Sequence, residues 1–240
     1  MGEAMEEKGK RKTMEKIPLT ITTPITDNIQ QILQQLKPNV RLIAVSKTVS
    51  VEKMREAYGA GIRDFGENRL QEACAKQEQL KDLEGISWHF IGHLQKNKAK
   101  LAVQTMDWIH SVDDLKLAQS LNRRANELNK RPKVCLQIKI LPDPNKYGWS
   151  VEQLLETLPE LEACDSLDIQ GLMTILPLEL SEAEIFDAFV EVAKFKEQLN
   201  QTTQLNLKEV SMGMSGDYLQ AIKAGATMIR LGSKIFGKRE

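Results

Sequence analysis

Lys47 is the residue whose type and place in this sequence most directly suggest chemistry. It follows the run 41–46, which is typical of a β-strand, so its amine lies just past the carboxyl end of that strand. Apolar surroundings at such a place remove water from the ammonium group, lower its pKa and free the amine to form a Schiff base. The position taken alone favours a solvated lysine instead, because lysine is almost always a surface residue.

Two segments near the C-terminus, rich in glycine and serine, have the composition of an anion site. The first has the sequence SMGMSGD at 211–217, and the second is Gly232 followed by Ser233. Each lies between a strand and the start of a helix, where backbone N–H groups and the helix dipole favour an anion. We therefore predict that Ser215, Gly216, Gly232 and Ser233 bind a phosphate. Ordinary turns with a helix cap are the alternative.

Arg230 and Asn68 are further polar residues at predicted strand ends. Arg230 lies two residues before Gly232, so strand alternation points both to one side. A buried arginine needs an acceptor, and either a pyridine nitrogen or an internal carboxylate satisfies it; the residues leave both open. Asn68 offers an amide near the same rim, although the residues alone favour a structural role for it as the N-cap of the next helix.

The histidines and cysteines do not suggest a metal site. His89 and His93 lie four residues apart, and four residues along a strand span about 13 Å, too far to share an ion. His93 falls where a loop begins, which leaves open whether it lines a ligand site or is solvated. The cysteines are scattered and odd in number and form no C-x-x-C pair, which argues against zinc and against a disulfide framework. We predict no metal and a reducing, cytoplasmic location.

Charge and hydropathy exclude two classes of partner. The 33 basic residues balance 33 acidic ones, so no global field favours nucleic acid or an anionic membrane surface. No apolar run reaches the roughly 20 residues that span a bilayer, and the N-terminus lacks the apolar region of a secretory signal. We therefore expect a soluble protein that binds neither nucleic acid nor membranes.

The elements that position these residues alternate regularly along the chain. Eight runs have the composition of short strands: 41–46, 62–65, 87–92, 108–111, 134–140, 169–175, 209–212 and 228–231. Runs with helical periodicity and recognisable ends lie between them, at 51–58, 69–83, 95–106, 114–129, 151–161, 181–200 and 217–224. Strand and helix repeated eight times predict a parallel sheet closed into a single (β/α)8 barrel, which suits the length of 240 residues. An open doubly wound sheet is the alternative.

The N-terminal region differs from the rest in composition. Residues 1–20 mix Glu, Lys and Arg with few large aliphatic groups, and we predict that they form a disordered charged tail. An extra helix follows, with Asp27 as its cap and Pro38 ending it. Residues 21–240 then form one domain, with its chemistry at the carboxyl ends of the strands.

Several of these motifs together are similar to one known family. The chain resembles the pyridoxal phosphate homeostasis proteins, single-domain relatives of the alanine racemase N-terminal domain, which is a TIM barrel. The resemblance runs from about Val40 to Gly237, and its segment 141–149 resembles cyanobacterial members. It rests on the runs VSK at 45–47, FGEN at 65–68, HFIGHLQKNK at 89–98, GLMT at 171–174, SMGMSGD at 211–217 and RLGSKIFG at 230–237.

The resemblance implies a cofactor and roles for the predicted residues. Lys47 would bind pyridoxal 5'-phosphate as a Schiff base, and Asn68 would lie beside the cofactor ring. Ser215, Gly216, Gly232 and Ser233 would hold the phosphate, and Arg230 would face the pyridine nitrogen. An arginine there keeps that nitrogen unprotonated and weakens the cofactor as an electron sink.

The resemblance further implies a regulatory protein of vitamin B6 and amino-acid balance, with no catalytic residue. Related racemases take a second acid/base residue from an additional domain, which we expect to be absent here because the chain ends just beyond the eighth strand. We accordingly expect a monomer, with pyridoxal-phosphate-dependent apoenzymes as transient clients.

Alternatives and departures remain open. A Schiff-base enzyme of the aldolase or racemase type would use the same lysine and phosphate site, and an interaction-driven regulator could retain the pocket as a relic. Lys139 and Lys234 stand where the family commonly has asparagine and a small residue. If either reaches the pocket, it would change the local charge or accept an aldehyde.

Overall fold

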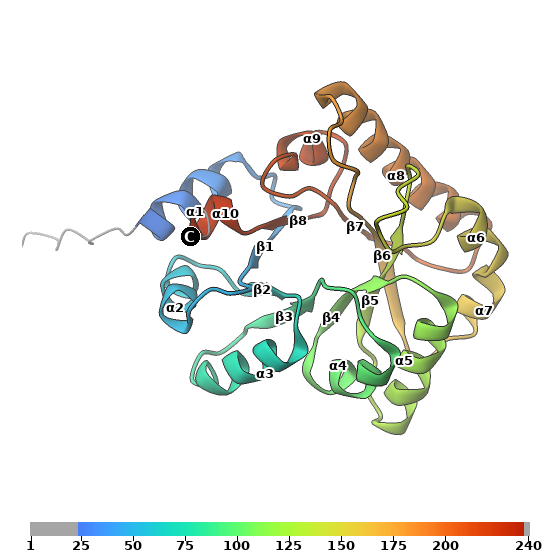
Figure 1. The fold of residues 1–240 in the computed structure, drawn as a ribbon, viewed down its shortest axis with the longest axis horizontal. Coiled ribbons are helices and arrows are strands. Elements are labelled where there is room, and N and C mark those ends of the chain that lie inside the picture. Colours follow the sequence, from blue (N-terminus) through green and yellow to red (C-terminus); the bar gives the residue numbers. More distant parts are fainter. Residues whose placement is uncertain (1–23, 238–240) are drawn as a thin grey trace, which may run out of the picture.

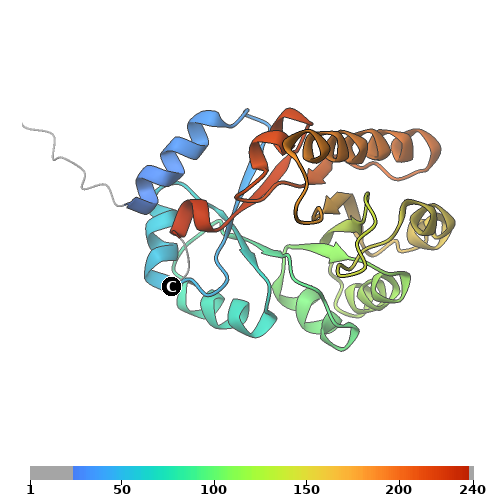
Figure 2. The ribbon, with the colours of Figure 1, turned by 45° about the horizontal axis from the view of Figure 1, so that its top comes forward.

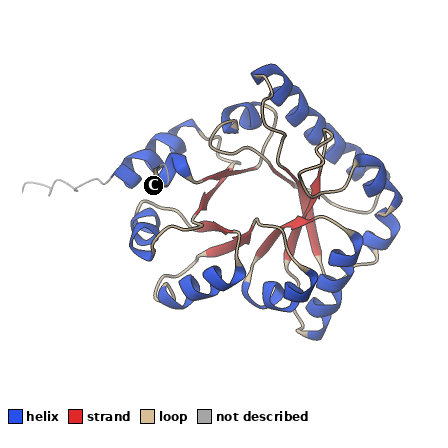
Figure 3. Ribbon diagram, in the orientation of Figure 1, coloured by secondary structure: helices blue, strands red, loops and turns tan. Residues whose placement is uncertain are grey.

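The computed structural model describes residues 24–237, which form a closed barrel of eight parallel strands in sequence order. Figures 1 and 3 show the strands around a central axis with the helices outside them. The closed barrel and its chain order are as predicted, and the open sheet is excluded. The strands are β1 (Arg41–Val45), β2 (Asp64–Glu67), β3 (Ser87–Phe90), β4 (Trp108–Val112), β5 (Lys133–Ile138), β6 (Asp168–Thr174), β7 (Glu209–Ser211) and β8 (Met228–Leu231).

The helices follow the predicted order with three differences. The region 95–106 divides into η1 and α4, the region 151–161 divides into α6 and α7, and a short helix, α10, follows β8. The second division falls at Thr157, just before Pro159. The elements are α1 (Pro24–Gln35), α2 (Val51–Gly59), α3 (Leu70–Gln79), η1 (Lys96–Lys98), α4 (Ala99–Thr105), α5 (Leu115–Glu127), α6 (Val151–Glu156), α7 (Leu158–Glu162), α8 (Glu182–Thr202), α9 (Tyr218–Lys223) and α10 (Ser233–Phe236).

Two predicted helix caps are wrong. Asp27 lies within the first turn of α1, because the helix already begins at Pro24. Asn68 is not the N-cap of α3; that position belongs to Arg69, which makes no side-chain capping bond. Asn68 therefore does not have the capping role that the residues alone had favoured.

The barrel buries two sets of side chains because strand residues alternate between its inside and its outside. Outward-facing residues pack under the helices in one large apolar core, with Phe65 and Ile109 fully buried. A smaller separate cluster lies within the barrel and consists of Ile43, Trp108, Cys135, Met173 and Met228. The interior is thus packed with side chains, so a ligand fits only at an open end.

Helix α1 packs beside the last elements of the chain. The Asn28 side-chain amide donates to the Ile235 carbonyl at 3.1 Å, and the Tyr218 hydroxyl donates to the Gln35 side chain at 3.1 Å. Figure 2 shows α1 running alongside the β8–α10 region. The predicted charged tail, 1–20, lies outside the described residues. Among the helices described, none is both long and apolar enough to cross a membrane.

Candidate functional site

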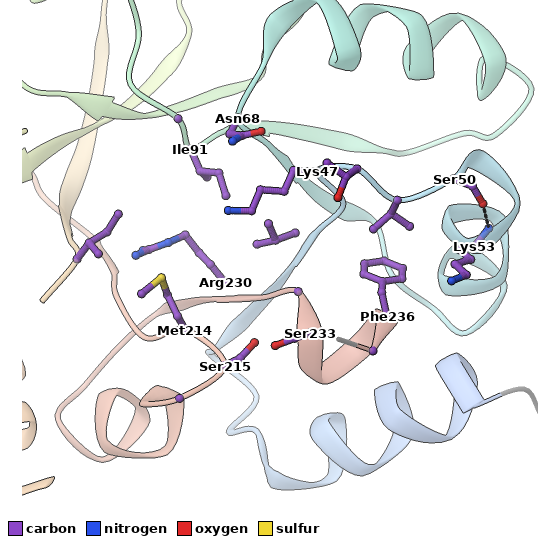
Figure 4. Close-up of a pocket in the computed structure, with 18 residues that line it drawn as sticks. Lys47, Ser50, Lys53, Asn68, Ile91, Met214, Ser215, Arg230, Ser233 and Phe236 are labelled. Atoms are coloured by element: carbon purple, nitrogen blue, oxygen red, sulfur yellow. Dashed lines mark hydrogen bonds between the residues drawn. The ribbon is translucent and has the colours of Figure 1, made fainter. Parts of the chain in front are cut away.

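A cavity of about 1150 Å³ opens at the carboxyl ends of the strands. All seven predicted site residues line it, although they lie as far apart in sequence as Lys47 and Ser233. Figure 4 shows the Lys47 amine and the Arg230 guanidinium extending into one space, with the Ser215 and Ser233 hydroxyls below them. The residues that line the cavity are Val45, Lys47, Thr48, Val49, Ser50, Lys53, Asn68, Ile91, Gly92, Ile175, Met214, Ser215, Gly216, Arg230, Gly232, Ser233, Phe236 and Gly237.

The backbone on both sides of Lys47 is held by a cluster of charged groups, of which Lys76 is buried and Glu72 half-buried. Lys76 of α3 donates from Nζ to the Ser46 carbonyl at 2.7 Å and to Glu72 Oε1 at 2.6 Å. The same Glu72 oxygen accepts from the Thr48 backbone N–H at 2.6 Å. Thr48 has a φ of 64°, a strained value for a β-branched residue, so this bond stabilises an unusual backbone turn. Side chains of α3 therefore hold the peptide groups on both sides of Lys47.

Glu67, the last residue of β2, completes this cluster. Its side chain is fully buried; Oε1 accepts from the Ser46 hydroxyl at 2.6 Å and from Lys76 at 2.8 Å. Oε2 has no partner among the described residues. Burial raises the pKa of Glu67, while the bonds from Lys76 and Ser46 oppose that rise. The carboxylate is thus held in place chiefly by one buried lysine.

Asn68 reaches the cavity because its backbone packs closely against a glycine. A Cβ placed on Gly92 would lie 2.4 Å from the Asn68 carbonyl oxygen, so only glycine fits there without a shift. The neighbouring Ile91 N–H donates to the Glu67 carbonyl at 2.9 Å. The loops after β2 and β3 are therefore fitted to each other at the cavity rim.

The loop after β7 turns sharply and presents backbone donors. Gly213 has a φ of 89°, and the Met214 N–H donates to Asp217 Oδ1 at 2.5 Å, which closes the loop on itself. Within the described chain, no hydrogen bond takes up the backbone N–H groups of Ser215, Gly216 or Ser233. Free N–H groups beside two serine hydroxyls form a suitable cradle for an anion.

Arg230 is buried in the barrel and bonded to neutral groups. Its Nη1 donates to Ser211 Oγ at 2.7 Å and its Nη2 to the Thr174 carbonyl at 2.8 Å. The ion pairs among the described residues do not include Arg230, so the internal carboxylate pair is not found. Burial lowers the pKa of Arg230 to about 10, with Asp217 opposing, and the group stays protonated at neutral pH. Its remaining N–H groups are available to a ligand.

The histidines take no part in lining the cavity. His93 Nδ1 bonds to Asp113 Oδ2 at 2.9 Å, and its ring stacks on Tyr147 with centroids 3.6 Å apart. Burial raises the pKa of Asp113, and the bond to His93 opposes that rise. His89 lies inside the barrel, fully buried. The described residues contain no group of three side chains suited to a metal, and the absence of a metal remains a prediction.

Neither Lys139 nor Lys234 lines the cavity. A different lysine that the sequence analysis did not single out, Lys53, does so from α2. The helix start that follows Lys47 was the available sequence signal, since Lys53 lies in the first turn of α2, where the Ser50 hydroxyl accepts from the Lys53 N–H at 3.5 Å. Phe236 was also missed, because α10 was not predicted.

Comparisons with known proteins agree with this geometry. The family model for the alanine racemase N-terminal domain matches residues 22–240. A pyridoxal phosphate homeostasis protein of Synechocystis is 54% identical over 87% of this chain and 96% of its own length. One from Pseudomonas aeruginosa is 40% identical over 84% of this chain and 85% of its own length.

Solved structures give the same result. PipY of Synechococcus elongatus has a TM-score of 0.87 at 50% identity and covers 89% of this chain and 100% of its own; a second structure of it, with PLP bound, has a TM-score of 0.86 at 48% identity. An alanine racemase of Clostridium difficile has a TM-score of 0.71 at 16% identity over 90% of this chain and 57% of its own, a likeness of fold alone. The chain therefore belongs to the pyridoxal phosphate homeostasis protein family, which is built on the alanine racemase N-terminal domain.

Proposed function

We propose that this protein binds pyridoxal 5'-phosphate and serves intracellular vitamin B6 homeostasis and amino-acid balance without robust catalysis. The observation that carries the proposal is the gathering of all seven predicted residues around one cavity. Lys47 is the proposed covalent attachment point. Its Nζ would condense with the cofactor aldehyde, and the C=N bond would form with loss of one water.

The residues fit such a ligand in both charge and shape. Ser215, Gly216 and Ser233 supply free backbone N–H groups and two hydroxyls for a phosphate. A Cβ on Gly216 would meet nothing within 4 Å, so this part of the wall is open. Arg230 lies across the cavity as a permanent donor for a pyridine nitrogen. Lys47 extends its amine into the same cavity (Figure 4).

The composition of the cavity lining supports binding rather than turnover. Among the described residues, no carboxylate, imidazole, thiol or phenol lines the cavity; the ionisable side chains are Lys47, Lys53 and Arg230. Racemisation needs acid/base groups on both sides of the substrate carbon. The cofactor would supply an electron sink when bound. Arg230 would face its ring nitrogen, leave that nitrogen unprotonated and so weaken the electron sink.

A reduction experiment tests the attachment. Purified protein with pyridoxal 5'-phosphate should show a new visible absorption band, and borohydride should fix the adduct on Lys47, as peptide mapping would identify. Lys47→Ala should lose both signals, while Lys53→Ala, which removes the exposed lysine of the same cavity, should keep them. An adduct spread over surface lysines would refute the site. Trapping of a sugar phosphate without cofactor would favour an aldolase-type enzyme.

Catalysis and assembly need separate measurements. Chiral analysis of free amino acids incubated with the loaded protein should show no rapid racemisation, and rapid racemisation would overturn the non-catalytic assignment. We further propose a monomer in the cytoplasm, in keeping with three unpaired cysteines, that transfers cofactor transiently to apoenzymes. Light scattering tests the monomer. Activation of a pyridoxal-phosphate-dependent apoenzyme by loaded protein, faster than by free cofactor, tests delivery.

A further inference from the structure

An unbroken row of polar side chains crosses the barrel interior from Arg230. Arg230 Nη1 lies 2.7 Å from Ser211 Oγ, and Ser211 Oγ lies 2.9 Å from His110 Nδ1. His110 Nε2 lies 2.9 Å from His89 Nδ1, and His89 Nε2 lies 2.9 Å from Asp64 Oδ1. The row thus passes from β8 through β7, β4 and β3 to the first residue of β2, at the opposite mouth of the barrel. We call these five residues the interior chain.

The direction of every hydrogen bond in the interior chain follows from its first member. A guanidinium only donates, so Ser211 Oγ accepts from Arg230. The Ser211 hydroxyl hydrogen then has one acceptor among the described residues, His110 Nδ1. The reverse arrangement, with His110 Nδ1–H donating, would bury that hydroxyl hydrogen without an acceptor, which costs the desolvation of the group.

The remaining links follow in turn. An unprotonated Nδ1 places the proton of neutral His110 on Nε2, which therefore donates to His89 Nδ1. His89 then carries its proton on Nε2 and donates to Asp64. Each link has one donor and one acceptor, and both imidazoles are neutral. A row of this kind joins a cation at one end to a carboxylate at the other.

The surroundings oppose a charge on either imidazole. Both rings are fully buried, and burial lowers the pKa of His110 and of His89. The charged groups that act on them from neighbouring elements are Asp64, Arg41, Asp107 and Arg230. For His89 the bond to Asp64 opposes the effect of burial on the pKa, and Arg41 of β1 adds a smaller lowering. For His110 the neighbouring His89, Arg230 and Arg41 all lower the pKa further. Arg41 itself lies between the carboxylates of Asp64 and Glu209, at 3.8 and 3.9 Å.

We propose that the interior chain positions Arg230 in the cofactor pocket. Its two neutral imidazoles, each in a fixed tautomer, connect Arg230 through Ser211 to Asp64 and so hold the orientation and the charge of the guanidinium. This rests on the proposed function in one respect, that the ligand facing Arg230 is pyridoxal 5'-phosphate. Ser211 and the two histidines do not themselves line the cavity, and Ser211 contacts the lining residue Arg230, so their role is exerted through Arg230.

The first test uses protein without cofactor, so it does not depend on the proposed function. The sequence has three histidines, and His93→Gln leaves the two of the interior chain. Nitrogen-15 NMR of the ring nitrogens near neutral pH should show both as neutral Nε2–H tautomers. A protonated ring or an Nδ1–H tautomer at either position would overturn the proposal.

The second test reads Arg230 itself. Its guanidinium nitrogens should give sharp, separate nitrogen-15 signals in the parent protein, assigned by their loss in Arg230→Lys, and averaged signals in Ser211→Ala. Ser111→Ala is the matched control, because the Ser111 hydroxyl is equally buried, lies in β4 next to His110 and has no partner among the described residues. Unchanged Arg230 signals in Ser211→Ala would refute the positioning role.

Cofactor readouts extend the test and also separate the two proposals. Loss of an oriented charged hydrogen bond should speed release of pyridoxal 5'-phosphate from Ser211→Ala roughly tenfold or more. The Ser211→Ala substitution should also change the nitrogen-15 chemical shift of the labelled ring nitrogen of the cofactor. Ser111→Ala should change neither the release rate nor this chemical shift.

If Ser211→Ala fails to fold, Asp64→Asn keeps an acceptor for His89 and removes the terminal charge. It should change the release rate and the chemical shift in the same direction, but less. Equal behaviour of the Ser111 variant and the interior-chain variant would refute the inference. Failure of the parent to bind cofactor would refute only the proposed function.

Discussion

Replacing Lys76 with methionine should destabilise the protein by an amount that its surroundings determine. The Lys76 side chain is 8% exposed and donates to Ser46, Glu67 and Glu72, and the Glu67 side chain is 0% exposed. Removing one partner of a buried ion pair typically costs about 3–5 kcal/mol, because the other charge remains buried and unpaired. Methionine keeps the length of the side chain, so the loss of packing is small. We expect the free energy of unfolding to fall by about 3–5 kcal/mol at neutral pH.

The loss should depend on pH with a definite sign. Burial raises the pKa of Glu67 and Lys76 opposes that rise, so removing Lys76 raises it further. The folded state then binds the proton more tightly than the unfolded state, whose glutamate titrates near about 4.3. Stability therefore falls as the pH rises through the interval above that value. The difference between parent and Lys76→Met should be small near pH 4.5 and full at neutral pH.

Urea unfolding followed by tryptophan fluorescence measures this, because Trp88 and Trp108 are buried in the barrel. Lys81→Met is the matched control: Lys81 pairs with Glu78 on the same helix region, but both side chains are more than 70% exposed, and we expect no measurable change. Adding Glu67→Gln to Lys76→Met should recover much of the loss, since no buried charge then remains unpaired.

The reasoning would be refuted by either of two results. A loss below about 1 kcal/mol at neutral pH would show that Glu67 is not left charged and unpaired. A loss that is the same at acid and neutral pH would show that the destabilisation comes from lost packing and not from the charge. The variant should also weaken borohydride-fixed cofactor attachment, because Lys76 anchors the peptide group before Lys47.

Three further predictions follow from single positions. Gly213→Ala should destabilise the loop after β7 and weaken phosphate binding, because its φ is 89° and a Cβ would lie 2.6 Å from another side chain; calorimetry and titration with inorganic phosphate measure both. Iodoacetamide should label half-buried Cys74 faster than Cys135, which is fully buried with a raised thiol pKa, as mass spectrometry would show. His89 and His110 have pKa values lowered by burial, so the folded state binds fewer protons than the unfolded state, and stability should fall as the pH drops below about 6.5; denaturant midpoints across pH 5–8 measure this, and a flat profile would contradict it.

The order and number of strands could be read from the sequence because they depend on local patterns. Each strand is a short apolar run bounded by residues that end it, and Gly59 likewise ends α2. The positions of Lys47, Asn68 and Arg230 at strand ends followed from those patterns. Parallel strands then bring all their carboxyl ends to one mouth, so a correct list of strands already predicts which residues meet.

Features that depend on contacts between distant residues were not accessible in this way. Asn68 appeared to be a helix cap until the close approach of Gly92 showed it at the rim. Nothing in the local sequence distinguishes Lys76 from an exposed lysine of a helix, yet the packing of α3 on β2 buries it against Glu67. The acceptor of Arg230 was open in the sequence between a pyridine nitrogen and an internal carboxylate, and only the structure shows that its protein partners are the Ser211 hydroxyl and the Thr174 carbonyl.

The sequence by itself determined the barrel, the family and seven of the residues around the cavity, since these follow from periodicity, strand order and short motifs. The tertiary structure alone decided what holds those residues in place. His110 lies 101 positions from Ser211 and 21 from His89, and no local pattern relates them. Closing the barrel brings their side chains within hydrogen-bonding distance, and burial then fixes which atoms must be donors and which must be acceptors.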